Sequence, residues 1–349
     1  MGTPLPASGR STVSVIVPAR NEEASLTACL ESLVSQTGVP FEIIVVDDGS
    51  TDCTRSIADS FPGVRVIDPG PLPRGWSGKN NAVTAGARAA QGQWLLFTDA
   101  DTVHKPGSLA RAIAEAQEHH ADLLSYSPEQ EVHGLWEKAI MPVIFAELAR
   151  TYRPADVSDP HSPAAAANGQ YLLIARPAYE AIGGHAAVGT TLLEDVAMAR
   201  AVKASGRRIF FRFGGDAVHT RMYRTFPQLV EGWTKNLVLL FPNAGRLALV
   251  RLVEFAVLLA GYTFALSAWL GGVGRLAFLA AGVTFVLLGF LLNRIRKAHF
   301  SWDANLLALL GLPLFSYLLL RSKLFYKRGK VSWKGRTYAS DSVPVVKVS

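Results

Sequence analysis

The chain has 349 residues, of which 49% are hydrophobic and only 18% are charged. This composition excludes a disordered or fibrous chain and is typical of a protein that contacts a membrane. The net charge of +7 is unevenly distributed, because residues 1–240 carry −4 and residues 241–349 carry +11. Long apolar runs separate the basic residues of the second part, so we expect it to meet an anionic membrane surface and no nucleic acid.

Four short apolar runs predict buried strands at residues 13–18, 42–46, 64–67 and 94–98. Segments with helical spacing separate them, and we expect Asn21 to cap the first helix. Strands that alternate with helices predict an α/β domain with a mostly parallel sheet and helices on both faces. Ligands bind at the carboxyl ends of the strands in such sheets. No GxGxxG motif follows the first strand, which argues against a dinucleotide-binding domain.

Two carboxylates, Asp99 and Asp101, follow the fourth predicted strand. Carboxylates two residues apart at a strand end can hold one hard divalent cation, which can also bind phosphate oxygens. A turn that aspartate side chains stabilise is the alternative, and the pattern alone leaves both open. His219 follows another predicted strand and is a candidate for a further metal ligand.

Several polar residues are candidates for binding a nucleotide. Asp47 and Asp48 follow the second predicted strand, where they can accept hydrogen bonds from a uridine or, alternatively, belong to a helix cap. Lys79 lies at a helix start, where one cation and backbone N–H groups can face a diphosphate. Arg221 and Arg224 can clamp a phosphate, or else contact solvent or lipid headgroups.

Glu194 and Asp195 lie in a segment with helical character. We expect Thr190 or Thr191 to cap this helix. A carboxylate there can act as a general base toward a substrate hydroxyl group. The alternative is a pair of acids that the helix dipole favours in the first turn, and on these residues alone that alternative is the simpler one.

The order of these motifs along residues 13–241 resembles the family 2 glycosyltransferases with the GT-A fold. The motifs are PARNEE, VVDDGSTD, SGKNNA, FTDAD, NGQYLLI and LEDVAMARAVKASG. Residues 219–236 and 333–336 resemble a narrower group, the membrane-bound bacterial glycosyltransferases associated with carotenoid (diaponeurosporenoate) and hopanoid glycosylation.

The resemblance implies roles for individual residues. Asp195 becomes the catalytic base, and Asp101, together with Asp99, becomes the ligand of Mg²⁺ or Mn²⁺, with His219 as a possible addition. A nucleotide-sugar site is implied at Pro18, Ala19, Arg20, Glu22, Asp47, Asp48, Lys79, Asp99, Glu194, Arg221 and Trp233.

The implied activity is an inverting transfer of a sugar from a nucleotide sugar, expected to be a UDP-sugar, to a lipid or isoprenoid acceptor. A polyprenyl phosphate is an alternative acceptor, and a non-catalytic nucleotide-binding protein is a second alternative. The QxxRW element of the family is incomplete, because residues 228–233 keep Gln228 and Trp233 without the arginine. That departure argues against a processive polysaccharide synthase.

Three apolar runs, at residues 255–274, 276–293 and 304–320, are candidates for membrane-spanning helices. Residues 311–313 (Gly-Leu-Pro) interrupt the third run, so we expect it either to span or to turn back as a re-entrant segment. The predicted divisions are an N-terminal tail (1–12), a catalytic domain (13–241), a membrane region (242–325) and a basic tail (326–349).

The sequence also predicts on which side of the membrane the catalytic domain and the basic tail lie. Residues 1–12 contain no apolar run, so we expect no secretory signal and a catalytic domain on the cytoplasmic face of the inner membrane. Residues 321–336 hold seven Lys or Arg and no acid, which favours the same side. A helix at residues 136–149 is expected either on the membrane surface or inside the catalytic domain.

Overall fold

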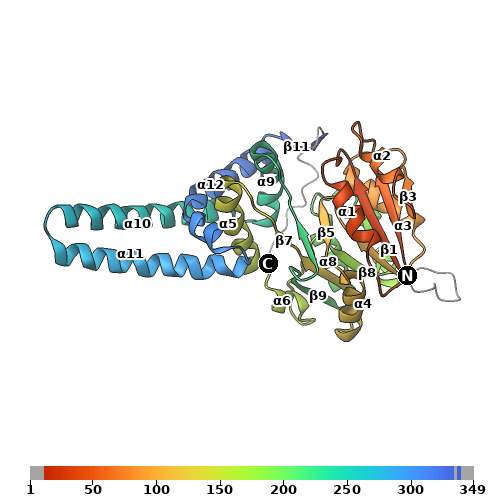
Figure 1. The fold of residues 1–349 in the computed structure, drawn as a ribbon, viewed down its shortest axis with the longest axis horizontal. Helices are drawn as coiled ribbons and strands as arrows, with labels where there is room; N and C mark the ends of the chain where they lie inside the picture. The colour runs from red at the N-terminus through yellow and green to blue at the C-terminus, as the bar shows by residue number, and fades with distance from the viewer. Residues whose placement is uncertain (1–11, 334–335, 339–349) are drawn as a thin grey trace. The chain divides into compact units, whose positions relative to one another are not determined.

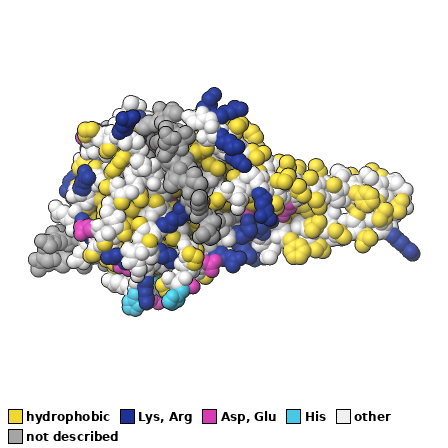
Figure 2. Space-filling view, turned by 180° about the vertical axis from the view of Figure 1, so that it is seen from behind, with side chains coloured by type: hydrophobic (Ala, Val, Ile, Leu, Met, Phe, Trp, Pro, Cys, Tyr) yellow, Lys and Arg dark blue, Asp and Glu magenta, His cyan; other side chains and the backbone are white. Residues whose placement is uncertain are grey.

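The computed structural model describes residues 12–333 and 336–338, with the elements labelled in Figure 1 and the side-chain types coloured in Figure 2. Packing divides the chain into two units. The first comprises Met1–Glu131 and Tyr152–Met222, and the second comprises Val132–Thr151 and Tyr223–Ser349. Residues 132–151 and 223–241 thus pack with the C-terminal helices, while the predicted domain boundaries stay a prediction.

A seven-stranded, mostly parallel sheet forms the centre of the first unit (Figure 1). Its order is β3-β2-β1-β4-β8-β6-β9, in which β8 runs antiparallel to both of its neighbours. The first four strands of the chain are adjacent in this sheet, which confirms the strands predicted from the apolar runs. The bounds are β1 Val13–Ala19, β2 Phe41–Asp47, β3 Val64–Ile67, β4 Trp94–Phe97, β6 Leu123–Ser127, β8 Leu172–Ala175 and β9 Ile209–Phe213.

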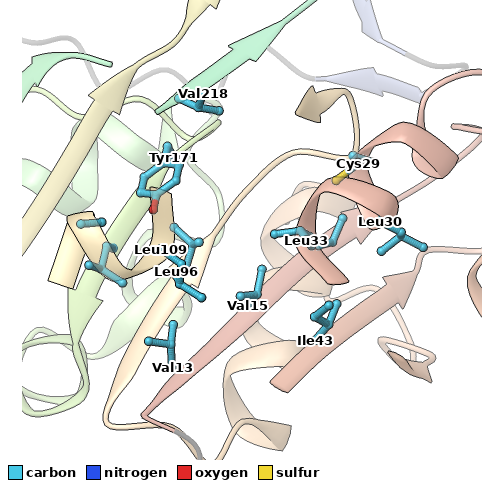
Figure 3. Packing of buried hydrophobic residues seen from close by; sticks show 14 of the residues in the cluster. Val13, Val15, Cys29, Leu30, Leu33, Ile43, Leu96, Leu109, Tyr171 and Val218 are labelled. Carbon is cyan, nitrogen blue, oxygen red and sulfur yellow. The ribbon is translucent and has the colours of Figure 1, made fainter. Parts of the chain in front are cut away.

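Helices cover both faces of this sheet. Val13, Val15 and Val17 of β1 pack on one face with side chains of α1 and α4 (Figure 3), whereas Ile16 packs on the other face with α3 and α8. Because successive strand residues point to opposite faces, a strand covered on both sides must be apolar throughout. The helices are α1 Leu26–Val34, α2 Thr54–Asp59, α3 Gly78–Ala89, α4 Ser108–Glu118, α6 Pro154–Ser158, α7 Arg176–Ala181, η1 Gly184–Val188 and α8 Glu194–Ala204.

A small sheet of three strands completes the first unit. It consists of β5 Thr102–His104, β10 Val218–Thr220 and β7 Glu129–Gln130, with β10 in the middle. Strand β10 runs antiparallel to β5 and parallel to β7. This sheet brings the turn after β4 close to the segment around residue 219, which lies more than a hundred residues later in the chain.

The predicted cap of the first helix is wrong. Helix α1 begins at Leu26, after Ser25, and Asn21 lies in the preceding loop with a φ of 53°. The Asn21 side-chain oxygen instead accepts a hydrogen bond from the Thr51 N–H at 2.9 Å. Asparagine tolerates this left-handed conformation better than most residues, and here its side chain joins the loops that follow β1 and β2.

The second unit is mainly helical. Helix α5 packs against α12, an arrangement that neither expectation for residues 136–149 included. Helix α9 also packs against α12, and strand β11 lies against α9. The elements are α5 Leu135–Thr151, α9 Phe226–Leu240, α10 Ala244–Leu270, α11 Gly274–Ile295, η2 Arg296–Ala298, α12 Trp302–Lys327, β11 Val331–Trp333 and β12 Arg336–Tyr338.

Among the described residues, three helices are long and apolar enough to cross a membrane: α10, α11 extended through η2, and α12. Helices α10 and α11 pack side by side, and hydrophobic side chains cover their outer surface (Figure 2). In the most apolar stretch, 17% of α10 and 11% of α11 is buried inside the protein, against 50% of α12. The first two helices therefore present the apolar surface that a bilayer would cover.

Of the two alternatives expected for the third apolar run, the re-entrant turn is wrong. Helix α12 continues without a break from Trp302 to Lys327, with Pro313 inside it. Gly311 allows close packing of α12 against α5. A Cβ atom at this position would overlap the carbonyl group of Ala139 in α5. The absence of a side chain lets the two helices approach closely, as small residues do at helix crossings.

A buried cluster of charges joins α5 to α10 and α11. The Glu147 side chain is 1% exposed and lies 3.1 Å from Arg251 Nε, 3.1 Å from Arg150 Nη2 and 3.7 Å from Arg294 Nε. Glu254 accepts hydrogen bonds from Arg251 and Arg294. A buried charge is tolerated only when it is paired, so these contacts hold the base of the α10–α11 pair against α5.

We predict that Glu147→Ala lowers the thermal stability of the full-length protein, because it leaves Arg251 and Arg294 without their buried partner. Removing one member of a buried ion pair costs about 3–5 kcal/mol. The measurement is the midpoint temperature of unfolding of the purified protein in detergent. Glu118→Ala, at the exposed end of α4, is the matched control and should leave the midpoint unchanged. Equal midpoints for the two variants would show that the cluster contributes little.

Candidate active site

The turn that carries Asp99 and Asp101 follows β4 and is supported by a network of buried hydrogen bonds. The Thr220 hydroxyl donates to the Asp101 carbonyl oxygen at 3.0 Å. The Thr98 hydroxyl donates to the Gln170 carbonyl oxygen at 2.8 Å. These bonds join the turn to the segment just before β8 and to β10, so the position of both carboxylates is fixed by segments distant in sequence.

His104 belongs to the same network. Its Nε2 lies 3.1 Å from the Thr98 hydroxyl, whose proton is already directed to a carbonyl oxygen, so this nitrogen is assigned as the donor. Burial, with a smaller contribution from His219, lowers the pKa of His104 to about 3. The ring therefore stays neutral at physiological pH and supports the turn without adding a charge to it.

Lys79 lies between two carboxylates at the carboxyl edge of the sheet. Its Nζ is 2.7 Å from Asp99 Oδ1 and 2.9 Å from Glu194 Oε1. Burial acts to lower the pKa of Lys79, but the two carboxylates outweigh burial and raise it well above its ordinary value. Lys79 is in the first turn of α3, at a helix start as the sequence predicts, and the Ser77 side chain caps this helix. The structure thus brings together three of the predicted site residues.

Asp195 is next to this cluster, in the first turn of α8. Its Oδ2 accepts a hydrogen bond from the Gly169 N–H at 3.0 Å, and its Oδ1 accepts one from the Val196 N–H at 2.7 Å. Burial, and then the charge of Glu194, raise the pKa of Asp195 from 3.8 to about 6. A carboxyl group with this pKa is a proton acceptor at neutral pH and is better matched to that role than an ordinary aspartate.

Gly169 is a site residue that the sequence reasoning missed. A Cβ atom there would lie 3.0 Å from Lys79 Nζ, 3.5 Å from Glu194 Oε1 and 3.6 Å from Asp195 Oδ2. The backbone can therefore approach the charged cluster only because this residue has no side chain. This glycine is visible in the NGQYLLI motif, but the need for a residue without a side chain follows only from its contacts with Lys79, Glu194 and Asp195.

Asn80 is a second residue that the sequence reasoning missed. Its Nδ2 lies 3.2 Å from the carbonyl oxygen of Val188, 2.9 Å from that of Gly189 and 2.9 Å from that of Thr191. It therefore fastens the start of α3 to the loop that leads into α8. The predicted cap by Thr190 or Thr191 is wrong, since the N-cap position is Leu193 and its side chain makes no capping bond.

The carboxyl ends of β1 and β2 form a neighbouring part of the same sheet edge. Asp47, which is 4% exposed, accepts a hydrogen bond from the Ser50 N–H at 3.2 Å. Arg20 donates to the Asp48 carbonyl oxygen at 2.8 Å. Arg55, which was not predicted, lies 3.8 Å from the Asp47 carboxylate. Two of the predicted nucleotide-binding acids are therefore placed together with a predicted arginine.

The remaining predicted residues of this edge lie in the same place. Pro18 and Ala19 pair with Val46 and Asp47 across the β1–β2 register. Glu22 follows in the loop, where its N–H donates to the Thr54 hydroxyl at 2.7 Å. The residues that follow β1 and β2 therefore lie together at the carboxyl ends of these strands, as the sequence predicts. Their roles in binding a nucleotide stay a prediction.

His219 is in β10, where its Nε2 lies 3.1 Å from Glu131 Oε1. Among residues 12–333 and 336–338, no three His, Cys, Asp or Glu side chains are arranged to hold a metal ion. Asp99 and Asp101 nevertheless supply oxygen ligands of the kind that Mg²⁺ and Mn²⁺ prefer. The donor set at the turn fits a hard cation, while His219 as a ligand stays a prediction.

The last predicted site residues are Arg221, Arg224 and Trp233. Arg221 follows β10 in the first unit, whereas Arg224 and Trp233 belong to the second. The Trp233 ring is 2% exposed and packs against Phe145. Gln228, which remains from the incomplete QxxRW element, forms a capping box at the start of α9. Roles for Arg221, Arg224 and Trp233 at phosphates or sugar stay predictions. Of residues 333–336, which resemble the narrower group of glycosyltransferases, 334 and 335 lie outside the described residues.

Comparison with known proteins gives a family match over part of the chain. Residues 14–172 match the family model described as "Glycosyl transferase family 2". The chain therefore contains a segment that is similar to the family 2 glycosyltransferases. It resembles the 4,4'-diaponeurosporenoate glycosyltransferase of Staphylococcus aureus strain MRSA252, with 28% identity over 344 residues, 94% of this chain and 88% of that protein. The protein of the same name from strain USA300 is 31% identical over 231 residues, 64% of this chain and 60% of its own length.

A solved structure confirms the fold. The mannosyltransferase PcManGT from Pyrobaculum calidifontis, in complex with GDP-Man and Mn²⁺, matches 91% of this chain and 87% of its own with a TM-score of 0.55. The sequence identity is 18%, so the similarity shows the fold alone. The predicted GT-A architecture is therefore confirmed.

We predict that Asn80→Ala loosens the loop before α8. The variant loses an NH2 group whose two protons are shared among three carbonyl oxygens, and each full hydrogen bond is worth about 1 kcal/mol. Hydrogen–deuterium exchange followed by mass spectrometry should show faster exchange in peptides that cover residues 188–195. In Asn81→Ala, the matched control, the lost bonds are to Gly70 and Pro71, so faster exchange should appear there instead. Unchanged exchange at residues 188–195 in Asn80→Ala would contradict the fastening role.

Proposed function

We propose that the protein is a membrane-bound, inverting glycosyltransferase that moves a sugar from a nucleotide sugar to a lipid acceptor of the isoprenoid type. The observation that carries this proposal is the cluster of Lys79, Asp99, Glu194 and Asp195 at the edge of the sheet. It combines a cation suited to a diphosphate with a carboxyl group of raised pKa. The family match supports an enzyme over the non-catalytic alternative.

The donor is proposed to be a UDP-sugar that lies along the edge formed by β1, β2 and β4. The carboxylates of Asp47 and Asp48 can accept hydrogen bonds from the uracil imide and the ribose hydroxyl groups. Arg20, which is held against Asp48, provides a positive charge at the same edge. PcManGT, which shares the fold, was solved with GDP-Man, so the choice of uridine depends on these carboxylates and not on that similarity.

Asp101, together with Asp99, is proposed to hold Mg²⁺ or Mn²⁺. When bound there, the cation would neutralise negative charge on the departing diphosphate. Lys79 contacts Asp99 directly, which leaves Asp101 as the principal metal ligand. Lys79 would then provide a second positive charge close to the diphosphate.

The chemical step needs a base on the acceptor side. Asp195 would accept the proton of an acceptor hydroxyl group while the acceptor oxygen bonds to the anomeric carbon. The bond from that carbon to the diphosphate oxygen breaks in the same step, so the configuration inverts. With a carboxylate acceptor no proton is transferred, and Asp195 would only orient it. The Gly169 N–H holds Asp195 in place during either reaction.

The acceptor is proposed to be a membrane lipid, and the enzyme to be in the inner membrane with its catalytic unit on the cytoplasmic side. Helices α10 and α11 expose the apolar surface that supports membrane insertion. The relatives from Staphylococcus aureus are named for a carotenoid acid, diaponeurosporenoate, which supports an isoprenoid acceptor. Mass spectrometry of lipids from cells with and without the gene tests this, because a glycolipid lost in the deletion identifies sugar and acceptor. No lost glycolipid, together with no hydrolysis of nucleotide sugars by the purified enzyme, would overturn the proposal.

We predict that Asp101→Asn abolishes sugar transfer and the dependence of donor binding on Mn²⁺. A neutral amide is a poor ligand for a hard cation between phosphates. Isothermal titration of the purified protein with UDP, with and without Mn²⁺, measures this effect. Asp59→Asn, at an exposed position on α2, is the control and should retain the Mn²⁺ dependence. Metal-dependent turnover that persists in Asp101→Asn would refute the assignment of the metal ligand.

We predict that Asp195→Asn lowers kcat with a hydroxyl acceptor by about 10²–10⁴-fold and leaves the affinity for the donor unchanged. In the native enzyme, kcat should fall as the pH drops through about 6, because Asp195 becomes protonated there. Glu194→Gln removes a charge that raises this pKa, so the fall should move to lower pH. The measurement is the pH profile of kcat. If the pH profile of Glu194→Gln matches that of the native enzyme, the fall of kcat at low pH does not come from protonation of Asp195.

A further inference from the structure

Helix α12 has one exposed apolar face, which we call the α12 stripe. Its large exposed hydrophobic side chains recur at intervals of three, four or seven residues, which places them on one side of a helix. Leu306 and Leu310 are 61% and 60% exposed, whereas Ala308 and Leu312 on the opposite side have no exposed surface. One side of α12 is therefore packed on protein, and the other side is available to lipid. The α12 stripe consists of Trp302, Leu306, Leu310, Tyr317, Leu320 and Leu324.

Contacts near both ends of α12 tie this helix to α5 and α9, which lie beside it (Figure 1). Near its start, Asp303 accepts a hydrogen bond from the Lys138 ammonium group of α5 at 2.6 Å. Near its end, the Tyr326 hydroxyl donates to the carbonyl oxygen of Lys235 in α9 at 2.8 Å. Wherever these parts of α5 and α9 lie with respect to a membrane, the two ends of α12 lie there as well.

The chain limits how far these contacts can be from the first unit. That unit includes Glu131, seven residues before Lys138, and Met222, thirteen residues before Lys235. With about 3.5 Å for each extended residue and 1.5 Å for each helical one, these paths reach about 18 Å and about 28 Å, against about 40 Å across a bilayer with its headgroups. Both ends of α12 are therefore on the side of the membrane that holds the first unit.

Helices α10 and α11 are not limited in this way. Arg294 in the last turn of α11 contacts Glu254 near the start of α10 at 2.8 Å, and their uncharged stretches, 255–274 and 276–293, run away from this pair. Each stretch is long enough to cross the hydrocarbon. The loop at their far end, residues 271–275, holds one arginine, whereas residues 321–333 hold five Lys or Arg and no acid. Basic segments favour the cytoplasmic side, so the charges agree with the limits set by the chain.

We propose that α12 lies in the membrane interface, parallel to the surface, with the α12 stripe toward the lipid chains and the basic residues after it at anionic headgroups. Only α10 and α11 would cross the bilayer. Helices that bind a membrane surface in this way bury their apolar face by about 5–10 Å. The inference rests on the membrane insertion in the proposed function and goes beyond it, since it does not depend on sugar transfer.

The first test compares the depth of two spin labels in liposomes of phosphatidylcholine and phosphatidylglycerol. Leu310→Cys and Val283→Cys are made in the full-length protein that carries serine at positions 29 and 53. Both positions are exposed, one near the middle of the uncharged stretch of α12 and the other near the middle of that of α11. Power-saturation EPR with oxygen and a water-soluble nickel complex measures each depth.

We expect the label at position 283 about 15 Å inside the hydrocarbon and the label at position 310 within about 10 Å of the surface. A spanning α12 would place both labels equally deep, which would overturn the proposal. A label at position 310 that meets the nickel complex as freely as one at Glu118→Cys, on the exposed surface of α4, would overturn it as well.

The second test determines the side of the membrane by labelling spheroplasts with a membrane-impermeant maleimide. Val273→Cys, between α10 and α11, should react in closed spheroplasts. Lys330→Cys, after α12, should react only when they are opened, as should the exposed native Cys53 of the first unit, which is the internal control. Labelling of Lys330→Cys in closed spheroplasts, or of Val273→Cys only in opened ones, would overturn the proposal.

Sugar transfer is measured separately, as turnover of a UDP-sugar by the protein in the same liposomes. Equal depths at positions 283 and 310 together with turnover would refute the position of α12 and leave the proposed function standing. The expected depths without turnover would do the reverse.

Discussion

The contact of the Lys79 ammonium group with Asp99 and Glu194 is the interaction on which the site depends. Three carboxylates, including Asp195, lie at one edge of the sheet, and without a cation their mutual repulsion would oppose this arrangement. Burial alone disfavours each charge, and the pairing compensates for that cost. The three acids therefore have different surroundings. Asp99 and Glu194 both contact Lys79, whereas Asp195 has a raised pKa.

The order of the strands explains why these residues meet. Strand β1 pairs with both β2 and β4 in parallel, so the loops that follow all three strands come out at one edge. Helix α3 begins at that edge, so Lys79 lies there in its first turn, and Asn80 fastens the loop before α8. Covering both faces of the sheet requires strands that are apolar throughout, which confines the polar chemistry to the strand ends.

The parts of the fold that are encoded locally could be predicted from the sequence. Strands β1 to β4, the start of α3 and the acids at the strand ends each depend on a short run of residues, and the structure has all of them. The missed features depend on contacts between distant segments, as with Gly169 beneath the charged cluster, or Gly311 against Ala139. A turn-forming or helix-breaking residue permits more than one backbone conformation. Packing against the rest of the protein determines which conformation the residue adopts. For that reason Asn21 does not cap the helix that follows it, and Pro313 does not break the helix that contains it.

The three apolar helices differ in what covers their apolar side chains. The outward surface of α10 and α11 is covered by no described residue over most of its length, so lipid is the partner that lowers its free energy. Helix α12 has half of its apolar stretch buried against α5, α9 and α10, and the Glu147 cluster holds the other two helices to the same α5. The position of α12 is therefore fixed mainly by protein contacts, whereas α10 and α11 depend on lipid to cover their apolar surface.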